Sequence, residues 1–200
     1  MTAQAAAAHE HQAPGGVTGL SRGMAGMVLF IGSEVMLFGG LFAGYFYVRS
    51  QAAIWPPEGV KTVDWTLGLG LTILLVLSGL VAHFGVVAVK AGNRQWLVIG
   101  VGLAIVMGGA FIAGQAYEWL RLMDEGLSAK SNVYGGTFFV MTGFHGAHVI
   151  AGLALLAVVF VRSLAHDFTR VRHVLVDASV LYWHFVDIVW VFLFAVLYLA

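Results

Sequence analysis

The sequence contains no cysteine among its 200 residues. Disulfide frameworks, thiolate metal sites, iron–sulfur clusters and cysteine nucleophiles all require this side chain, so each of these classes is excluded. Because no thiol is present, cysteine usage gives no information about the redox state of the compartment. The absence of cysteine therefore restricts the candidate metal ligands and nucleophiles, but it does not indicate the cellular compartment of the protein.

Charged side chains are also scarce. Asp, Glu, Lys and Arg make up 10% of the chain, against roughly 25% in soluble domains. The ten acidic and ten basic residues cancel, and no basic cluster appears, which excludes the electrostatic case for a nucleic-acid partner. Hydrophobic residues make up 60% of the sequence, and these proportions together indicate a membrane protein.

Proline is rare, with three residues in the chain. One stands in residues 1–22, a small and polar stretch without the basic start and apolar core of a cleavable signal peptide. We expect residues 1–22 to form a flexible tail and residues 23–200 to form one membrane domain. The other two, Pro56 and Pro57, follow Trp55 and predict a turn at the membrane interface, because tandem proline cannot continue a helix.

Five apolar runs are long enough to cross a bilayer, which takes about 20 residues. The sequence therefore predicts an all-α polytopic membrane protein with five transmembrane helices in a bundle. Small residues recur in the runs, and they either let helix backbones approach closely or are simply tolerated beside lipid. These small residues include Gly40 and Gly44, which form a GxxxG pair, and Gly108 and Gly109. The runs cover approximately residues 24–48, 65–89, 96–117, 133–161 and 178–199.

An odd number of spans places the two termini on opposite sides of the membrane. Cytoplasmic segments of membrane proteins carry an excess of Lys and Arg. With the N-terminus inside, the inner segments hold six such residues: Arg22, Lys90, Arg94, Arg162, Arg170 and Arg172. The outer segments then hold four: Arg49, Lys61, Arg121 and Lys130. The pattern predicts a cytoplasmic N-terminus and a periplasmic C-terminus.

Two acidic residues fall inside the apolar runs, where no Lys or Arg is available. Glu34 lies in the first run and Asp187 in the fifth, whereas Glu118 lies at the end of the third, where its side chain can reach the interface. An ionised carboxylate at the bilayer centre costs about 2.5 to 3.5 kcal/mol. We therefore expect Glu34 and Asp187 to be neutral, hydrogen-bonded or beside water.

Histidines accompany these acids. His145 and His148 stand three residues apart, on one helix face, so both could point at a single neighbour. His184 and Asp187 have the same spacing. At about 1.5 Å per residue, Glu34 and Asp187 reach similar depths, and His148 reaches that level from the other side. The sequence is thus consistent with one polar cluster linking the first, fourth and fifth spans.

Such a cluster has three interpretations. A bis-histidine haem needs two imidazoles from different helices, and four intramembrane histidines could supply them: His83, His145, His148 and His184. A zinc or di-iron site needs three or four converging ligands, typically with Glu-x-x-His on several helices. Here His-x-x-His and His-x-x-Asp occur once each in the apolar runs, so hydrogen bonding between helices is favoured over metal ligation.

Five phrases of the sequence match a known family. In chain order they are "SEVMLFGGLFAGYFY", "WPPEGV", "QAYEW", "VYGGTFFVMTGFHGAHVIAGL" and "YWHFVDIVWVFLF". Together they resemble subunit III of the haem–copper oxidases, specifically of cytochrome c oxidase. The resemblance runs from Gly26 to Leu199, in order and nearly without gaps.

The resemblance implies a subunit without haem or copper, and therefore without catalytic, cofactor-binding or metal-binding residues. It implies packing in a complex with subunits I and II, which would carry the haem and copper. It also implies phospholipids held in a cleft, support of proton uptake and turnover stability, and membership of a larger respiratory supercomplex. Glu34 would be a membrane-embedded carboxyl, and His145 and His148 would hydrogen-bond between helices. Candidates for contact with lipid or a partner subunit are Trp55, Trp183 and Trp190.

The longer members of this family have seven helices, and this chain begins at what would be their third. Five-helix forms occur in bacteria, so the resemblance implies the inner, cytoplasmic membrane of a bacterium. Residues 55–60 and 182–190 favour the cytochrome c branch, with a quinol oxidase subunit or a nitric oxide reductase-associated homologue as alternatives. From other classes, an autonomous haem-binding membrane cytochrome and an independent proton channel stay open.

Overall fold

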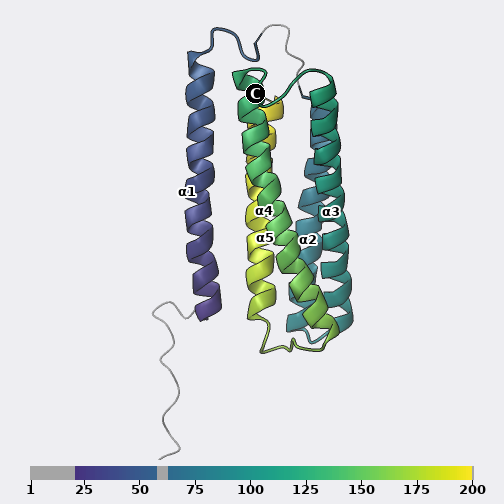
Figure 1. Cartoon of the computed structure of the whole chain (residues 1–200). Helices are drawn as coiled ribbons and strands as arrows, with labels where there is room; N and C mark the ends of the chain where they lie inside the picture. Colours follow the sequence, from purple (N-terminus) through teal and green to yellow (C-terminus); the bar gives the residue numbers. More distant parts are fainter. Residues whose placement is uncertain (1–20, 58–62, 200) are drawn as a thin grey trace, which may run out of the picture.

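A computed structural model of the chain describes residues 21–57 and 63–199. The described residues form five long helices (Figure 1): α1 (Arg22–Gln51), α2 (Trp65–Lys90), α3 (Arg94–Asp124), α4 (Val133–Leu164) and α5 (Val174–Phe194), the last continued by a π-helical turn (Ala195–Leu199). All five are long and apolar enough to cross a membrane. The prediction of an all-α membrane protein with five spans is confirmed, while the tail expected over residues 1–22 lies almost entirely outside the described residues.

The helices begin where the sequence supplies a side-chain acceptor for free backbone N–H groups. Four helices have such a cap, formed by Ser21, Asp64, Asn93 and Asn132. Asp64 accepts hydrogen bonds from the hydroxyl and the backbone N–H of Thr66, and these bonds hold the pKa of the Asp64 carboxyl below its usual value. The polar residues between the apolar runs therefore determine where four of the helices start.

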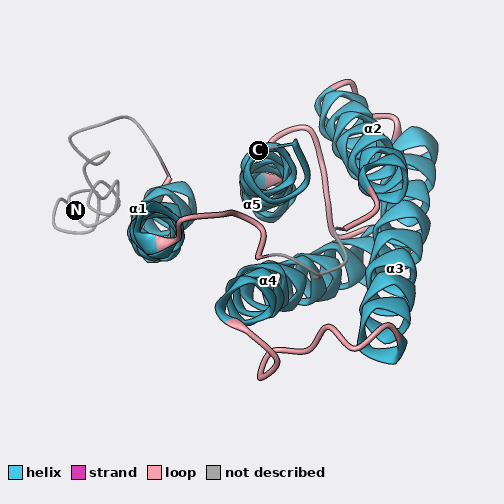
Figure 2. Cartoon of the chain, turned by 90° about the horizontal axis from the view of Figure 1, so that it is seen from above, coloured by secondary structure: helices cyan, strands magenta, loops and turns pink. Residues whose placement is uncertain are grey.

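Helices α2, α3, α4 and α5 form the body of the bundle, and α1 stands at its edge beside α5 and α4 (Figure 2). α5 packs against α1, α2 and α4, and most of its residues are buried, whereas α1 has few buried residues in the isolated chain. Such an exposed apolar helix is suited to lipid or to other membrane helices.

Trp183 and Trp190 lie in the interior of the bundle. Both are fully buried, and their indole N–H groups donate 3.0 Å hydrogen bonds across to α2, from Trp183 to Ser78 Oγ and from Trp190 to Thr72 Oγ1. The expectation that these two tryptophans contact lipid or a partner subunit is wrong, because hydroxyls of α2 satisfy the indoles inside the chain. Trp55 is half-buried and donates to the Tyr45 hydroxyl, next to a cis bond to Pro56.

Glycine makes room for the ring of Trp183. A Cβ atom would lie 2.7 Å from the ring at Gly108 on α3 and 2.6 Å from it at Gly152 on α4. At Gly109, by contrast, a Cβ would meet no described atom within 4 Å, and the same holds for Gly40 and Gly44. The close approach of the Trp183 ring therefore explains why position 108 is glycine. Gly40 and Gly44, the GxxxG pair of α1, have no such neighbour among the described residues.

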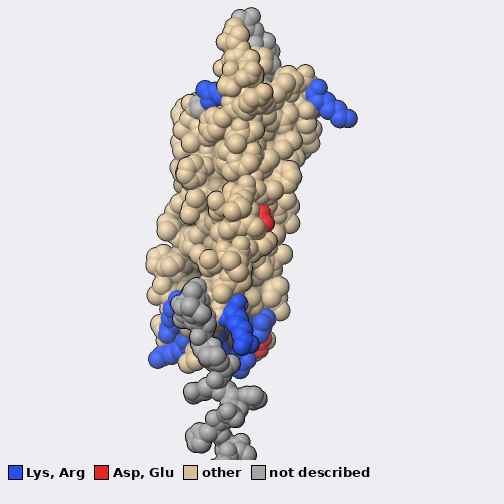
Figure 3. Space-filling view, turned by 90° about the vertical axis from the view of Figure 1, so that its left-hand side faces the viewer, with Lys and Arg blue, Asp and Glu red and all other residues tan. Residues whose placement is uncertain are grey.

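Basic residues gather at the two ends of the bundle, with more of them at the end where α1 begins (Figure 3). Lys90 pairs there with Asp177 at 3.0 Å, and Arg94 donates to the last carbonyls of α4, those of Ser163 and Leu164. The middle of the visible surface carries no blue and only a small acidic area. This distribution is that of a membrane span with polar ends.

The contrast between neighbouring glycines predicts two opposite outcomes. Gly108→Leu should destabilise the chain by about 1 to 3 kcal/mol, because the new side chain would overlap the buried ring of Trp183. Gly109→Leu should have little effect or stabilise slightly, since leucine favours the helix more than glycine does. Unfolding of the two variants in mixed detergent micelles, followed by circular dichroism, measures the difference. Equal stabilities would contradict the packing described here.

Candidate functional site

Glu34 of α1 and His148 of α4 form a polar pair inside the membrane. The Glu34 Oε2 and His148 Nε2 atoms are 2.8 Å apart, and both side chains are mostly buried. The His148 Nδ1 atom lies 2.7 Å from the carbonyl oxygen of Phe144. A carbonyl only accepts, so Nδ1 carries a hydrogen, and the hydrogen between the pair sits either on Glu34 or on Nε2. In both arrangements the pair has zero net charge, which reduces the free-energy cost of its position.

Neighbouring side chains hold this pair in place. Phe38, one turn after Glu34, is buried and sets its ring edge-on to the His148 imidazole, with centroids 5.0 Å apart. The Tyr182 hydroxyl of α5 donates a 3.2 Å hydrogen bond to the backbone carbonyl of His148. The pair therefore sits where α1, α4 and α5 meet, and it joins α1 to the rest of the bundle.

His145 has different surroundings from His148. Its ring is fully buried between Phe111 of α3 and Trp190 of α5, with centroids at 5.8 and 5.0 Å. Neither ring nitrogen has a hydrogen-bond partner among the described residues. The expectation that both histidines point at one neighbour and hydrogen-bond between helices is wrong for His145, because a three-residue step turns it toward a different pair of helices.

Asp187 belongs to a second group, on the side of α5 that faces α2. Its Oδ2 atom lies 3.6 Å from His184 Nδ1, and the His184 ring packs against His83 of α2 with centroids 5.7 Å apart. The carboxylate also lies against Gly79, where a Cβ atom would overlap Oδ2. The single cluster of Glu34, His148 and Asp187 that the sequence allowed does not form, and the polar residues divide between two faces.

Glu118 forms a third polar contact, near the opposite end of the bundle from residue 22. It is 2% exposed and its Oε2 atom accepts a 2.6 Å hydrogen bond from the Tyr198 hydroxyl, which joins α3 to the π-helical turn after α5. The position of Glu118 would allow its side chain to reach the interface, but the structure buries it. Arg121, one turn later, reaches outward instead and pairs with Asp64 at 3.3 Å.

The sequence reasoning missed the hydroxyl groups that complete these contacts. Tyr182 and Tyr198 donate to the polar network, and Ser78 and Thr72 accept from the indoles. A tyrosine inside an apolar run is a usable signal, because a buried phenol normally finds a hydrogen-bond partner. Within residues 21–57 and 63–199, no group of three or more His, Asp or Glu side chains converges as a metal site would require.

The chain is similar to known proteins over nearly its whole length. The family model of cytochrome c oxidase subunit III matches residues 4–200. The chain belongs to the cytochrome c oxidase subunit III family. It is 40% identical to the probable cytochrome c oxidase subunit 3 of Nocardia farcinica over 178 residues, which cover 86% of this chain and 85% of that relative.

Two further relatives give the same result. The subunit 3 of Corynebacterium diphtheriae is 39% identical over 180 residues, covering 86% of this chain and 85% of the relative. The subunit 3 of Synechocystis is 41% identical over 177 residues, covering 88% and 75%. Subunit III of cytochrome c oxidase has no catalytic centre and no metal cofactor of its own, so its polar residues serve structure, binding or proton handling.

The contact between Glu34 and His148 predicts energetic coupling. His148→Leu alone should destabilise the chain, because it leaves a buried carboxyl without its partner. In the double variant with Glu34→Leu, the loss in free energy of unfolding should be smaller than the sum of the losses in the two single variants. The difference should be about 0.6 to 1.7 kcal/mol. Unfolding in detergent micelles gives the stabilities of the unaltered chain, the two single variants and the double variant.

A matched pair of substitutions controls for general effects on the same two helices. Leu29 and Ile150 are exposed residues of α1 and α4. The effects of Leu29→Ala and Ile150→Ala on the free energy of unfolding should therefore add, with no coupling between them. Additive effects for Glu34 and His148 as well would show that the two side chains do not interact.

Proposed function

We propose that this chain is the structural subunit III of a proton-pumping cytochrome c oxidase, a cofactor-free subunit that packs beside the catalytic subunit I and subunit II. In this proposal residues 23–200 act as one membrane domain that holds phospholipid next to α1 and supports proton uptake and stability during turnover. Membership of the family supports the proposed assembly of this chain with other oxidase subunits. Relatives that match over most of their length are named as cytochrome c oxidase subunits.

The observation that carries the lipid-holding role is a groove between α1 and α4. The groove is mostly apolar, has a volume of about 650 Å³ and includes Lys130 and Asn132 at its outer end. Lys130 offers a positive charge to a phosphate group, while the apolar walls suit an acyl chain. The apolar walls include Gly40, Leu41, Gly44, Val48, Gly136 and Val140.

Two hydrogen bonds hold α1 against the rest of the bundle and leave the groove between α1 and α4 unfilled. Glu34 ties the lower half of α1 to α4, and the Tyr45 hydroxyl donates a 3.0 Å hydrogen bond to the carbonyl of Val196 nearer the upper end. Few other residues of α1 approach α4. With no side chains at Gly40 and Gly44, the space beside α4 is left for lipid rather than filled by the protein itself.

The charge distribution supports a cytoplasmic N-terminus and a periplasmic C-terminus, in the inner membrane of a bacterium. At the end where α1 begins lie six basic residues: Arg22, Lys90, Arg94, Arg162, Arg170 and Arg172. The other end holds Arg49, Arg121 and Lys130 among the described residues. The excess of positive charge belongs on the cytoplasmic side, and in this proposed orientation the lipid groove lies in the outer leaflet.

For Glu34 we propose a structural role rather than a place in a proton path. Its pair with His148 is net neutral and links two helices. A relay would need further titratable groups leading away from the pair, but Asp187 faces α2 rather than α1. The pair therefore serves to hold α1 beside the groove.

Filling the groove tests the lipid-holding role. Gly44→Leu should reduce the phospholipid retained by the purified oxidase complex and shorten its active lifetime during turnover, because the new side chain enters the groove without a clash. Gly32→Leu is the matched control, since it lies on α1 outside the groove and also has free space. Native mass spectrometry and progress curves of oxygen consumption give the two readouts. Equal lipid retention in both variants would overturn the assignment.

Substitution of Glu34 separates its two candidate roles. In Glu34→Gln the amide N–H can still donate to His148 Nε2, so subunit retention, turnover and the proton-to-electron ratio should stay nearly unchanged. Glu34→Ala removes the bond and should weaken retention of the subunit. Stopped-flow measurement of proton release by the assembled complex in vesicles gives the ratio. If Glu34→Gln abolishes pumping while the complex remains assembled, the residue belongs to a proton path.

A further inference from the structure

We infer that the face formed by α2 and α5 is where a transmembrane helix of another oxidase subunit docks, through hydrogen bonds to His83 and His184, beside Asp187. This inference rests on the proposed function, because it assumes that the chain assembles with oxidase subunits. It adds which face of the chain makes the contact and which chemistry the partner helix must present. We call this face the α2–α5 polar groove.

The groove has a volume of about 350 Å³ and runs between the two helices. Its apolar walls include Val76, Leu80, Ile188 and Phe192, and the two polar side chains of its lining are His184 and Asp187. His184 is partly exposed, with 34% of its side chain accessible. His83 is exposed beside the groove and packs on His184.

All three polar residues lie at the depth of the hydrocarbon. At about 1.5 Å per residue, His83 is roughly 10 Å from the end of α2 at Lys90, and Asp187 roughly 20 Å from the start of α5 at Val174. A helix of 26 residues is about 39 Å long and exceeds the roughly 30 Å hydrocarbon layer by only a few ångströms at each end. The backbone positions of these residues therefore lie within the hydrocarbon layer.

The chain does not satisfy these groups by itself. His83 makes no hydrogen bond to any described residue, and the Oδ1 atom of Asp187 is inaccessible and without a partner among them. The 3.6 Å between Asp187 Oδ2 and His184 Nδ1 is too long for a hydrogen bond. Glu34, in contrast, has its 2.8 Å partner within the chain. The α2–α5 polar groove is the face on which polar atoms at bilayer depth still need a partner.

Acyl chains cannot supply that partner, because they carry no donor or acceptor. A protein helix can, and interhelical hydrogen bonds are a regular means of joining membrane helices. A hydroxyl, amide or indole group on the docking helix could bond to the open nitrogens of His83 and His184. The partner is therefore a helix of another subunit with such groups at mid-membrane depth.

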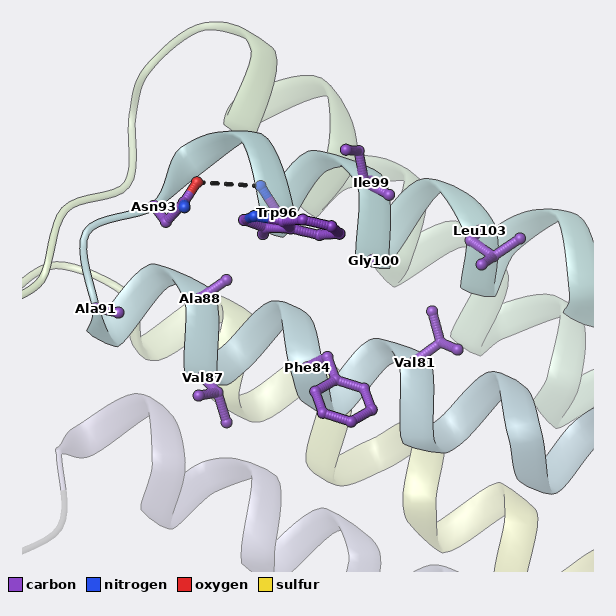
Figure 4. Close-up of a pocket in the computed structure, with 10 residues that line it drawn as sticks. All are labelled: Val81, Phe84, Val87, Ala88, Ala91, Asn93, Trp96, Ile99, Gly100 and Leu103. Carbon is purple, nitrogen blue, oxygen red and sulfur yellow. Dashed lines mark hydrogen bonds between the residues drawn. The ribbon is translucent and has the colours of Figure 1, made fainter.

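A second outward groove, between α2 and α3, provides the contrast (Figure 4). Its volume is about 400 Å³, and its walls include Val81, Phe84, Trp96 and Leu103. Its polar groups, the Asn93 amide and the Trp96 indole, lie at the end of the groove, where Asn93 accepts a hydrogen bond from the backbone N–H of Trp96. Acyl chains satisfy such a groove, and we use it as the lipid-facing control.

Photocrosslinking in native membranes tests the inference directly. A photoreactive amino acid at Leu80, in the α2–α5 polar groove, should crosslink this chain to another oxidase subunit, which mass spectrometry identifies. The same amino acid at Leu103 should crosslink mainly to lipid. The two sites are comparably exposed, at 52% and 46%. Crosslinking of Leu80 only to lipid, or to a second copy of this chain, would overturn the inference.

A substitution gives the energetic test. His83→Leu should loosen retention of this chain in the complex by about three- to fifteen-fold, the effect of one hydrogen bond between membrane helices. The free energy of unfolding of the isolated chain should stay nearly unchanged, because His83 makes no hydrogen bond to the described residues of the chain. The neighbouring Phe84→Leu, on the α2–α3 groove, should leave retention unaltered.

The outcomes separate the inference from the proposed function. Unchanged or improved retention of His83→Leu, as expected for a lipid-facing position, would overturn the docking face while the unaltered chain still purifies with the oxidase. Failure of the unaltered chain to purify with any oxidase subunit would instead reject the proposed function. Quantitative mass spectrometry of the gently solubilised complex reports both.

Discussion

The hydrocarbon core of a bilayer offers no hydrogen-bond partner, and this constraint explains most of the architecture. Backbone N–H and C=O groups at that depth have to be bonded within helices, so apolar runs of this length form helices. Side chains obey the same constraint, and across the bundle Glu34 meets His148, Trp183 meets Ser78, and Trp190 meets Thr72. Each of these contacts joins two helices, so polar side chains decide much of how the apolar helices pack.

The constraint also distinguishes the faces of the molecule. Beside α1 the polar groups are paired within the chain, and the groove next to them carries Lys130 at its outer end, which suits a phospholipid. On the α2–α5 polar groove, His83 and Asp187 lie at bilayer depth with unsatisfied atoms, which suits a protein helix. In the two proposals made above, one surface of the chain faces lipid and another faces a partner helix, and hydrogen-bond satisfaction rather than hydrophobicity separates them.

Several features of the site could be predicted from the sequence, and others could not. Glu34 and Asp187 were identifiable because an acid in an apolar run is costly anywhere in a membrane. That His148 contacts Glu34 while His145 faces Phe111 depends on how α4 is rotated against its neighbours, which the spacing of residues does not specify. Nor does hydropathy distinguish a tryptophan at the bilayer surface from one in the bundle.

The sequence by itself determined that the chain crosses the membrane five times, where most helices start, and which family it belongs to, because these depend on composition and local order along the chain. Only the tertiary structure decided which residues meet. Gly108 is required where the ring of Trp183 passes, whereas Gly109 next to it faces open space. The difference arises because helix rotation and neighbouring helices, not local sequence, set the distance between side chains that are far apart in the chain.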